Sequence, residues 1–94
     1  MDITVKSKDG KHVFNYSAAE GSWYDFDHKV AKDINGGELG ALELELIANG
    51  DVYGILKTGG NKICDVNIYD EDGNTVSDNY GIEDGATYIF EKCE

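Results

Sequence analysis

Turns that contain glycine divide this chain into short segments, and this spacing constrains the fold more than any other feature. Several turns contain Asp-Gly or Asn-Gly, which tolerate the positive φ that tight hairpins require. The segments between most of the turns suit strands, which need only about five residues. The spacing therefore predicts a domain built mainly from β-strands. The turns lie at residues 8–11, 35–37, 49–51, 58–61, 71–74 and 83–86.

The length of the chain predicts a single domain over residues 1–94. A chain of 94 residues buries roughly 60–68% of its unfolded surface, which leaves little room for a deep catalytic cavity. The first residues lack the apolar region of a secretory signal, and no run of about 18 apolar residues is present. We therefore expect a cytoplasmic, monomeric protein with no membrane contact.

One segment departs from the β pattern. Residues 22–34 read SWYDFDHKVAKDI, and their large apolar side chains are spaced three, four and four residues apart, as on one face of a helix. Ser22 and Asp25 resemble a capping box, and the Asn-Gly-Gly that follows suits a helix end. The pattern predicts one helix between the first hairpin and four further strands. The expected core pairs its apolar stripe with both ends of the chain: Trp23, Phe26, Val30 and Ile34 against Ile3, Val5, Tyr88 and Phe90.

The two ends of the chain carry further patterns. The opening residues 1–6, followed by Gly10 and Lys11, resemble the first hairpin of the ubiquitin family, and residues 71–82 with 87–90 resemble its last turn, short helix and final strand. The resemblance implies a β-grasp-like α+β fold, a mixed sheet packed on one helix, in which residues 2–6 pair in parallel with residues 86–91. Residues 38–62 add about one hairpin, so either of two segments could be the family's third strand.

The middle of the chain leaves another fold open, because the segment 66–74 would suit a small all-β sandwich equally well. Small bacterial members of the family carry a similar ending, so the resemblance implies a bacterial-type variant with an inserted hairpin. The C-terminal Gly-Gly of ubiquitin-type modifiers and sulfur carriers is replaced here by Glu91-Lys92-Cys93-Glu94. This ending argues against a conjugated modifier or a sulfur carrier.

The charge of the chain indicates the kind of partner. The net charge is −11 and there is no arginine; residues 1–32 hold five acids and five lysines, so the excess lies in residues 33–94. Proteins that read nucleic acids rely on positive charge and on the guanidinium group. We therefore expect no direct nucleic-acid binding, and a basic protein partner instead.

Catalytic and metal chemistry find little support in the sequence. His12 and His28 stand at no metal-ligand spacing, and no nucleophile and base can be paired. The residues around Gly73 do not fit a calcium-binding loop, because Ile68 would occupy its first ligand position. Cys64 and Cys93 are expected as reduced thiols. We therefore expect no catalytic residue, no metal, no cofactor and no enzyme activity.

The surface offers the remaining candidates for function. Seven acids lie between residues 65 and 84, with tyrosines among them, and tyrosine anchors combined with carboxylates would select a basic partner. The sequence favours a protein-protein interaction module of ubiquitin-like type. The alternative is a phage-type acidic inhibitor that imitates nucleic acid and occupies the basic site of a nucleic-acid-binding protein. The predicted binding residues are Tyr69, Asp70, Glu71, Asp72, Tyr80, Ile89 and Glu91.

Overall fold

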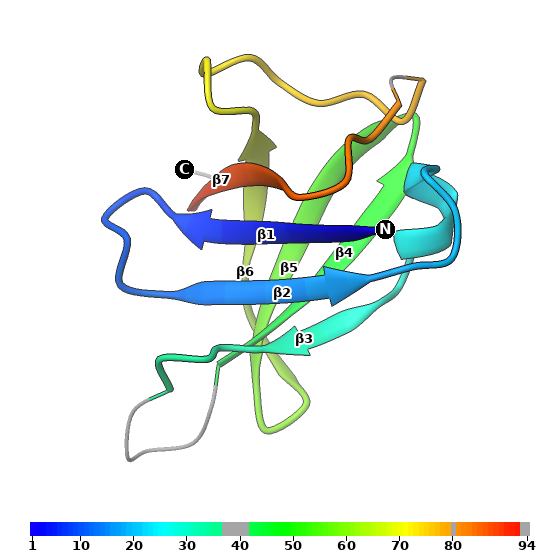
Figure 1. Cartoon of the computed structure of the whole chain (residues 1–94). Helices are drawn as coiled ribbons and strands as arrows, with labels where there is room; N and C mark the ends of the chain where they lie inside the picture. Colours follow the sequence, from blue (N-terminus) through cyan, green and yellow to red (C-terminus); the bar gives the residue numbers. More distant parts are fainter. Residues whose placement is uncertain (37–41, 80, 93–94) are drawn as a thin grey trace.

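The computed structural model of the chain describes residues 1–36, 42–79 and 81–92. Their strands form one seven-stranded sheet in the order β2-β1-β7-β6-β5-β4-β3 (Figure 1). A short 3-10 helix, η1 (Trp23–Phe26), lies between β2 and β3. The strands are β1 (Asp2–Ser7), β2 (Val13–Ser17), β3 (Val30–Lys32), β4 (Leu42–Asn49), β5 (Asp51–Thr58), β6 (Asn61–Tyr69) and β7 (Ala86–Lys92).

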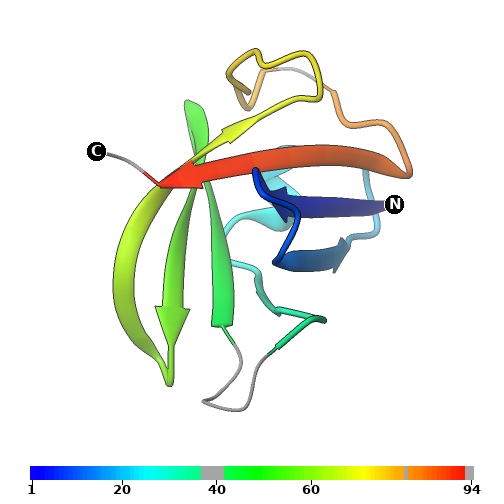
Figure 2. The ribbon, with the colours of Figure 1, turned by 90° about the vertical axis from the view of Figure 1, so that its left-hand side faces the viewer.

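The sheet curls until its two edge strands, β2 and β3, approach each other. Just beyond β3, the backbone N–H of Ile34 donates to the carbonyl of Val13 at 2.9 Å. The Tyr16 hydroxyl of β2 donates to the Leu44 carbonyl on β4. Figures 1 and 2 show β1 and β2 running across β4, β5 and β6 on the other side of a shared interior. The result is a nearly closed, barrel-like sheet.

A buried carboxylate fastens this closure. The Asp33 side chain is 1% exposed; its Oδ1 accepts hydrogen bonds from the backbone N–H groups of Val13 and Asn35, both at 3.0 Å. Its Oδ2 lies 2.7 Å from Nδ1 of His12. Burial acts to raise the pKa of Asp33, but these hydrogen bonds outweigh it and hold that pKa below its usual value. The ionised carboxylate thus supplies hydrogen-bond acceptors at the point where the pairing between strands ends.

The core fills the space that the curled sheet encloses. Alternate side chains of each strand point inward, and aromatic rings meet edge to face, with 5.8 Å between the centroids of Phe14 and Phe90 and 5.1 Å between Trp23 and Tyr88. Two side chains of η1 therefore complete a core that comes mainly from the strands. The largest fully buried side chains are Trp23, Phe14, Phe26, Ile3, Leu44, Leu46, Ile68, Val5 and Val66.

The predicted helix over residues 22–34 is wrong. Ser22 does cap a helical turn, because its hydroxyl accepts a hydrogen bond from the Tyr24 N–H at 3.1 Å. The 3-10 helix ends at Phe26, and His28 adopts a positive φ of 63°, which lies outside the right-handed helical region. The chain then enters β3, which pairs antiparallel with β4.

Weak helix propensity and tertiary bonds explain this difference. Aromatic residues, Asp, His and Val, which dominate this segment, are poor helix formers. Asp27 Oδ1 instead accepts a hydrogen bond from the Ala48 N–H at 2.9 Å, which ties the segment to β4. Trp23 and Phe26 are buried as predicted, whereas Val30 and Ile34 are 48% and 62% exposed. Only the first half of the apolar stripe therefore reaches the core.

The predicted β-grasp fold is also wrong, because the described residues contain only the four-residue 3-10 helix η1 and no α-helix for the sheet to pack on. The curled sheet encloses most of the core, and the hairpin of β4 and β5 forms an integral part of this sheet. One expectation is confirmed: β1 and β7 pair in parallel, from Ile3 opposite Ala86 to Ser7 opposite Phe90. The alternative, a small all-β sandwich, is right that the domain is built almost entirely of strands, but its two-sheet arrangement is wrong, since the strands are neighbours in one continuous sheet.

Across the described ranges, no helix combines the length and the apolar character needed to cross a membrane.

Candidate protein-binding face

The candidate site lies on the outer face of three neighbouring strands, β5, β6 and β7. Since side chains alternate along a strand, every second residue points away from the core. This face carries two shallow grooves, one over β6 and β7 and the other over β5 and β6. The outward residues are Asp51, Tyr53 and Ile55 of β5, Asp65, Asn67 and Tyr69 of β6, and Thr87, Ile89 and Glu91 of β7.

The first groove, here called the acidic-turn groove, gathers most of the predicted binding residues. Strand register explains this arrangement, because Tyr69 lies directly opposite Ile89 in the antiparallel pair of β6 and β7. Both side chains are half-buried, so they form an apolar centre for the groove. Its volume is about 520 Å³, and it is lined by Lys8, Tyr69, Asp70, Glu71, Gly73, Ile89 and Glu91.

An ion pair closes one side of this groove. Lys8 Nζ, just beyond β1, lies 2.6 Å from Glu91 Oε1, and this hydrogen bond raises the pKa of Lys8. Glu91 is one of the binding residues predicted from the sequence. The structure pairs it with a lysine from the other end of the chain, which the sequence spacing of 83 residues could not reveal.

The acidic turn itself is held by one of its own carboxylates. Asp70 Oδ1 accepts hydrogen bonds from the N–H groups of Asp72 and Asn74, at 3.0 and 2.9 Å, and Gly73 supplies the positive φ of 87° that the turn requires. Asp70 is therefore a structural residue as well as a groove residue. Glu71 and Asp72 are exposed, and within the described residues neither forms an ion pair.

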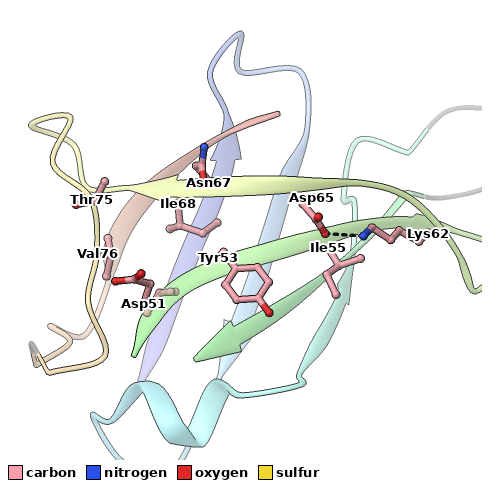
Figure 3. Close-up of a pocket in the computed structure, with 10 residues that line it drawn as sticks. Asp51, Tyr53, Ile55, Lys62, Asp65, Asn67, Ile68, Thr75 and Val76 are labelled. Carbon is pink, nitrogen blue, oxygen red and sulfur yellow. Dashed lines mark ion pairs between the residues drawn. The ribbon is translucent and has the colours of Figure 1, made fainter. Parts of the chain in front are cut away.

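The second groove, here called the Tyr53 groove, was not predicted from the sequence. Figure 3 shows its lining residues on β5, β6 and the loop that follows β6. The alternation of Asp51, Tyr53 and Ile55 in the sequence was the signal that could have indicated an outward face. The groove has a volume of about 630 Å³ and is lined by Asp51, Val52, Tyr53, Ile55, Lys62, Asp65, Asn67, Ile68, Thr75 and Val76.

One loop forms a wall of both grooves. After the acidic turn the chain doubles back, so that Thr75 forms a β-bridge with Tyr69 and the Val76 carbonyl accepts a hydrogen bond from the Val52 N–H at 3.1 Å. Asp70 and Glu71 face the acidic-turn groove, whereas Thr75 and Val76 face the Tyr53 groove. The two grooves are therefore parts of one surface.

The remaining candidates lie elsewhere. Tyr80, the seventh predicted binding residue, falls outside the described residues. His12 contacts Asp33 at the closure of the sheet, and Nδ1 of His28 lies 2.9 Å from Glu45 Oε2, which raises the pKa of His28. Among the described residues no group of three or more His, Cys, Asp or Glu side chains could hold a metal ion.

Cys64, the cysteine within the described part of the chain, lines neither groove. Cys64 is a half-buried free thiol on β6, and Cys93 falls outside the described residues.

Comparison with known proteins yields no match to a protein-family model, to a curated protein or to a solved structure. The function therefore has to be argued from the surface of this molecule.

Proposed function

We propose that this chain is a non-enzymatic protein-binding module whose acidic-turn groove contacts a basic protein partner. The observation that carries the proposal is the position of Tyr69 beside Ile89, with the exposed carboxylates of Glu71 and Asp72 in the adjoining turn. Tyrosine supplies a large contact area and a hydroxyl at a small cost in conformational entropy, and is enriched among residues that dominate binding energy.

The carboxylates would act on association rather than on the strength of the final contact. The excess of acids in residues 33–94 attracts a basic partner over several ångströms and disfavours acidic ones.

The alternative, an inhibitor that imitates nucleic acid, would present carboxylates along one face without an apolar centre. On this face Glu91 and Asp65 are already paired with Lys8 and Lys62, and Tyr69 and Ile89 lie between Glu91 and the acidic turn. These features favour the protein-binding module over the inhibitor.

The test is capture of partners from the source lysate by the immobilised protein, washed at 0.1 M and 1 M salt. These concentrations shorten the Debye length from roughly 10 Å to about 3 Å. We expect Tyr69→Ala to abolish capture at both salts, mainly through faster dissociation. We expect the double change Glu71→Gln/Asp72→Asn to weaken capture at low salt, mainly through slower association. Asp70 is left unchanged because it holds the turn.

The matched control is Glu20→Gln/Glu83→Gln, which removes two exposed carboxylates outside both grooves. It should leave capture nearly unchanged. If the turn variant loses capture at every salt while Tyr69→Ala does not, the inhibitor becomes the better explanation. If none of the changes affects capture, the acidic-turn groove is not the site that binds the partner.

A further inference from the structure

The Tyr53 groove has a regular spacing that the proposed function does not use. Asp51, Tyr53 and Ile55 occupy every second position of β5, and Asp65 of β6 lies directly opposite Ile55. Strands rise about 3.3 Å per residue, so the carboxylates of Asp51 and Asp65 stand roughly 13 Å apart along the strand direction. Figure 3 shows them at opposite ends of the groove, with Tyr53 between them.

The lining of the Tyr53 groove changes in character from one end to the other. Tyr53, which is 36% exposed, lies in the central part, whereas Ile55 lies at the Asp65 end and Val76 at the Asp51 end (Figure 3). Asp51, at one end, forms no ion pair within the part of the chain that the structure describes. The groove therefore has an apolar part, the ring of Tyr53, between two acidic ends.

A lysine of the chain itself, Lys62, partly occupies the Asp65 end of the groove. Lys62 Nζ lies 2.9 Å from Asp65 Oδ1, with side chains 56% and 46% exposed (Figure 3). Ion pairs as exposed as this one contribute little stability. A guanidinium group can bind a carboxylate through two hydrogen bonds, whereas an ammonium binds as a point charge. An incoming arginine can therefore displace Lys62.

We propose that the Tyr53 groove binds an extended segment of the basic partner, in which cationic, apolar and cationic side chains occupy every second position. In an extended chain these three side chains point the same way, and the two cations lie about 13 Å apart. In a helix, residues four positions apart lie only about 6 Å apart, so one helix turn would not reach both carboxylates. The net charge of −11 disfavours a second copy of this chain as the occupant.

This inference rests on the proposed function, since it names the segment of the partner that is recognised. Its test uses two capped synthetic peptides of identical composition and charge. The first has the order glycine, arginine, serine, leucine, serine, arginine, glycine. In the second the leucine exchanges places with the preceding serine, so that in an extended chain it points away from the side of the arginines.

Binding is measured by titration of the 15N-labelled full chain in an NMR experiment. We expect the first peptide to bind about fivefold more tightly, because only its leucine reaches the apolar part of the groove. The largest shifts should fall on the amides of Tyr53, Ile55, Asp65, Asn67 and Thr75. Equal affinities for the two peptides, or shifts elsewhere, would overturn the proposal.

Two charge-matched variants separate local recognition from long-range attraction. Lys62→Gln frees Asp65 and should tighten binding of the first peptide about two- to fivefold. Lys11→Gln makes the same charge change in the β1–β2 turn, outside the groove, and should have less than about half that effect at 0.15 M salt. Equal effects of the two changes would mean that peptide binding depends only on net charge, which would contradict recognition by the Tyr53 groove.

The two proposals can fail independently. If Tyr69→Ala abolishes partner capture but the peptides are not distinguished, the acidic-turn groove stands and the inference about the Tyr53 groove is wrong. If the peptides are distinguished but Tyr69→Ala does not affect capture, the proposed binding site is wrong and the Tyr53 groove remains.

Discussion

Asp33 links β2 to the segment after β3 at the point where the sheet closes. A carboxylate buried this completely would be costly without partners, and three hydrogen-bond contacts provide them. Because the pKa of Asp33 is lowered in the folded protein, the ionised form stabilises the fold. The stabilisation is fully present above the unfolded pKa of about 3.9 and is lost as the pH falls through the folded pKa.

Replacement of Asp33 by alanine should therefore lower the free energy of unfolding at pH 7 by about 1–3 kcal/mol, because it leaves buried N–H donors without acceptors. Urea denaturation of the wild type and Asp33→Ala at pH 7 and pH 3 tests this. The difference between the two proteins should shrink at pH 3. A difference that does not change with pH would show that the ionised carboxylate is not responsible.

Gly54, which has no side chain, lies in the interior of β5. A Cβ atom at this position would lie 2.9 Å from both Leu44 Cδ1 and Val66 Cγ2. Gly54→Ala should lower the free energy of unfolding by about 1–3 kcal/mol, as overpacked core substitutions do. Gly81→Ala is the control, since nothing lies within 4 Å of its Cβ position. An equal loss of stability in both variants would contradict the packing argument.

At the scale of elements, the segment from η1 to β3 shows which part of a helical pattern survives in a β-sheet protein. Trp23 and Phe26 lie three residues apart, a spacing that one turn of 3-10 helix satisfies as well as an α-helix does. Beyond that turn, pairing with β4 provides the backbone hydrogen bonds that a weak helix-forming sequence would otherwise make within itself. The extended conformation therefore prevails from Val30 onwards.

The consequence is an unequal distribution of stability along this segment. Phe26→Ala should cost about 3–5 kcal/mol, as large core truncations do, because Phe26 is 0% exposed. Ile34→Ala should change the stability by less than about 0.5 kcal/mol. Thermal or chemical denaturation of the two variants provides the measurement. Similar losses at both positions would favour a continuous helix that buries the whole stripe.

At the scale of the whole molecule, the surplus of negative charge acts on stability as well as on binding. Self-repulsion among charges of one sign destabilises a compact state, and salt screens it. The midpoint of thermal unfolding at pH 7 should therefore rise between 0.01 M and 0.15 M sodium chloride. Near pH 4.3, the isoelectric point, the same addition of salt should have little effect. A rise of the same size at both pH values would point to a cause other than net charge.

The candidate site could be predicted from the sequence only as far as local rules extend. Alternation in the last strand placed Ile89 outward between the buried Tyr88 and Phe90, and the Asp-Gly pair located the acidic turn. Neither rule determines the register between β6 and β7. The position of Tyr69 opposite Ile89 is therefore known only from the structure. The pairing of Lys8 with Glu91 depends in turn on the parallel alignment of β1 and β7.

The sequence by itself determined the turns and most of the strands, because glycine conformations and side-chain alternation are properties of a few neighbouring residues. It did not determine the state of residues 27–34, where local propensity is weak and bonds to β4 decide the conformation. The sequence also did not determine that the sheet closes. The hydrogen bonds that close the sheet join β2 to Asp33 and Ile34, which lie about twenty positions further along the chain. Contacts at that separation depend on how the sheet curls around its core, and only the tertiary structure decides that.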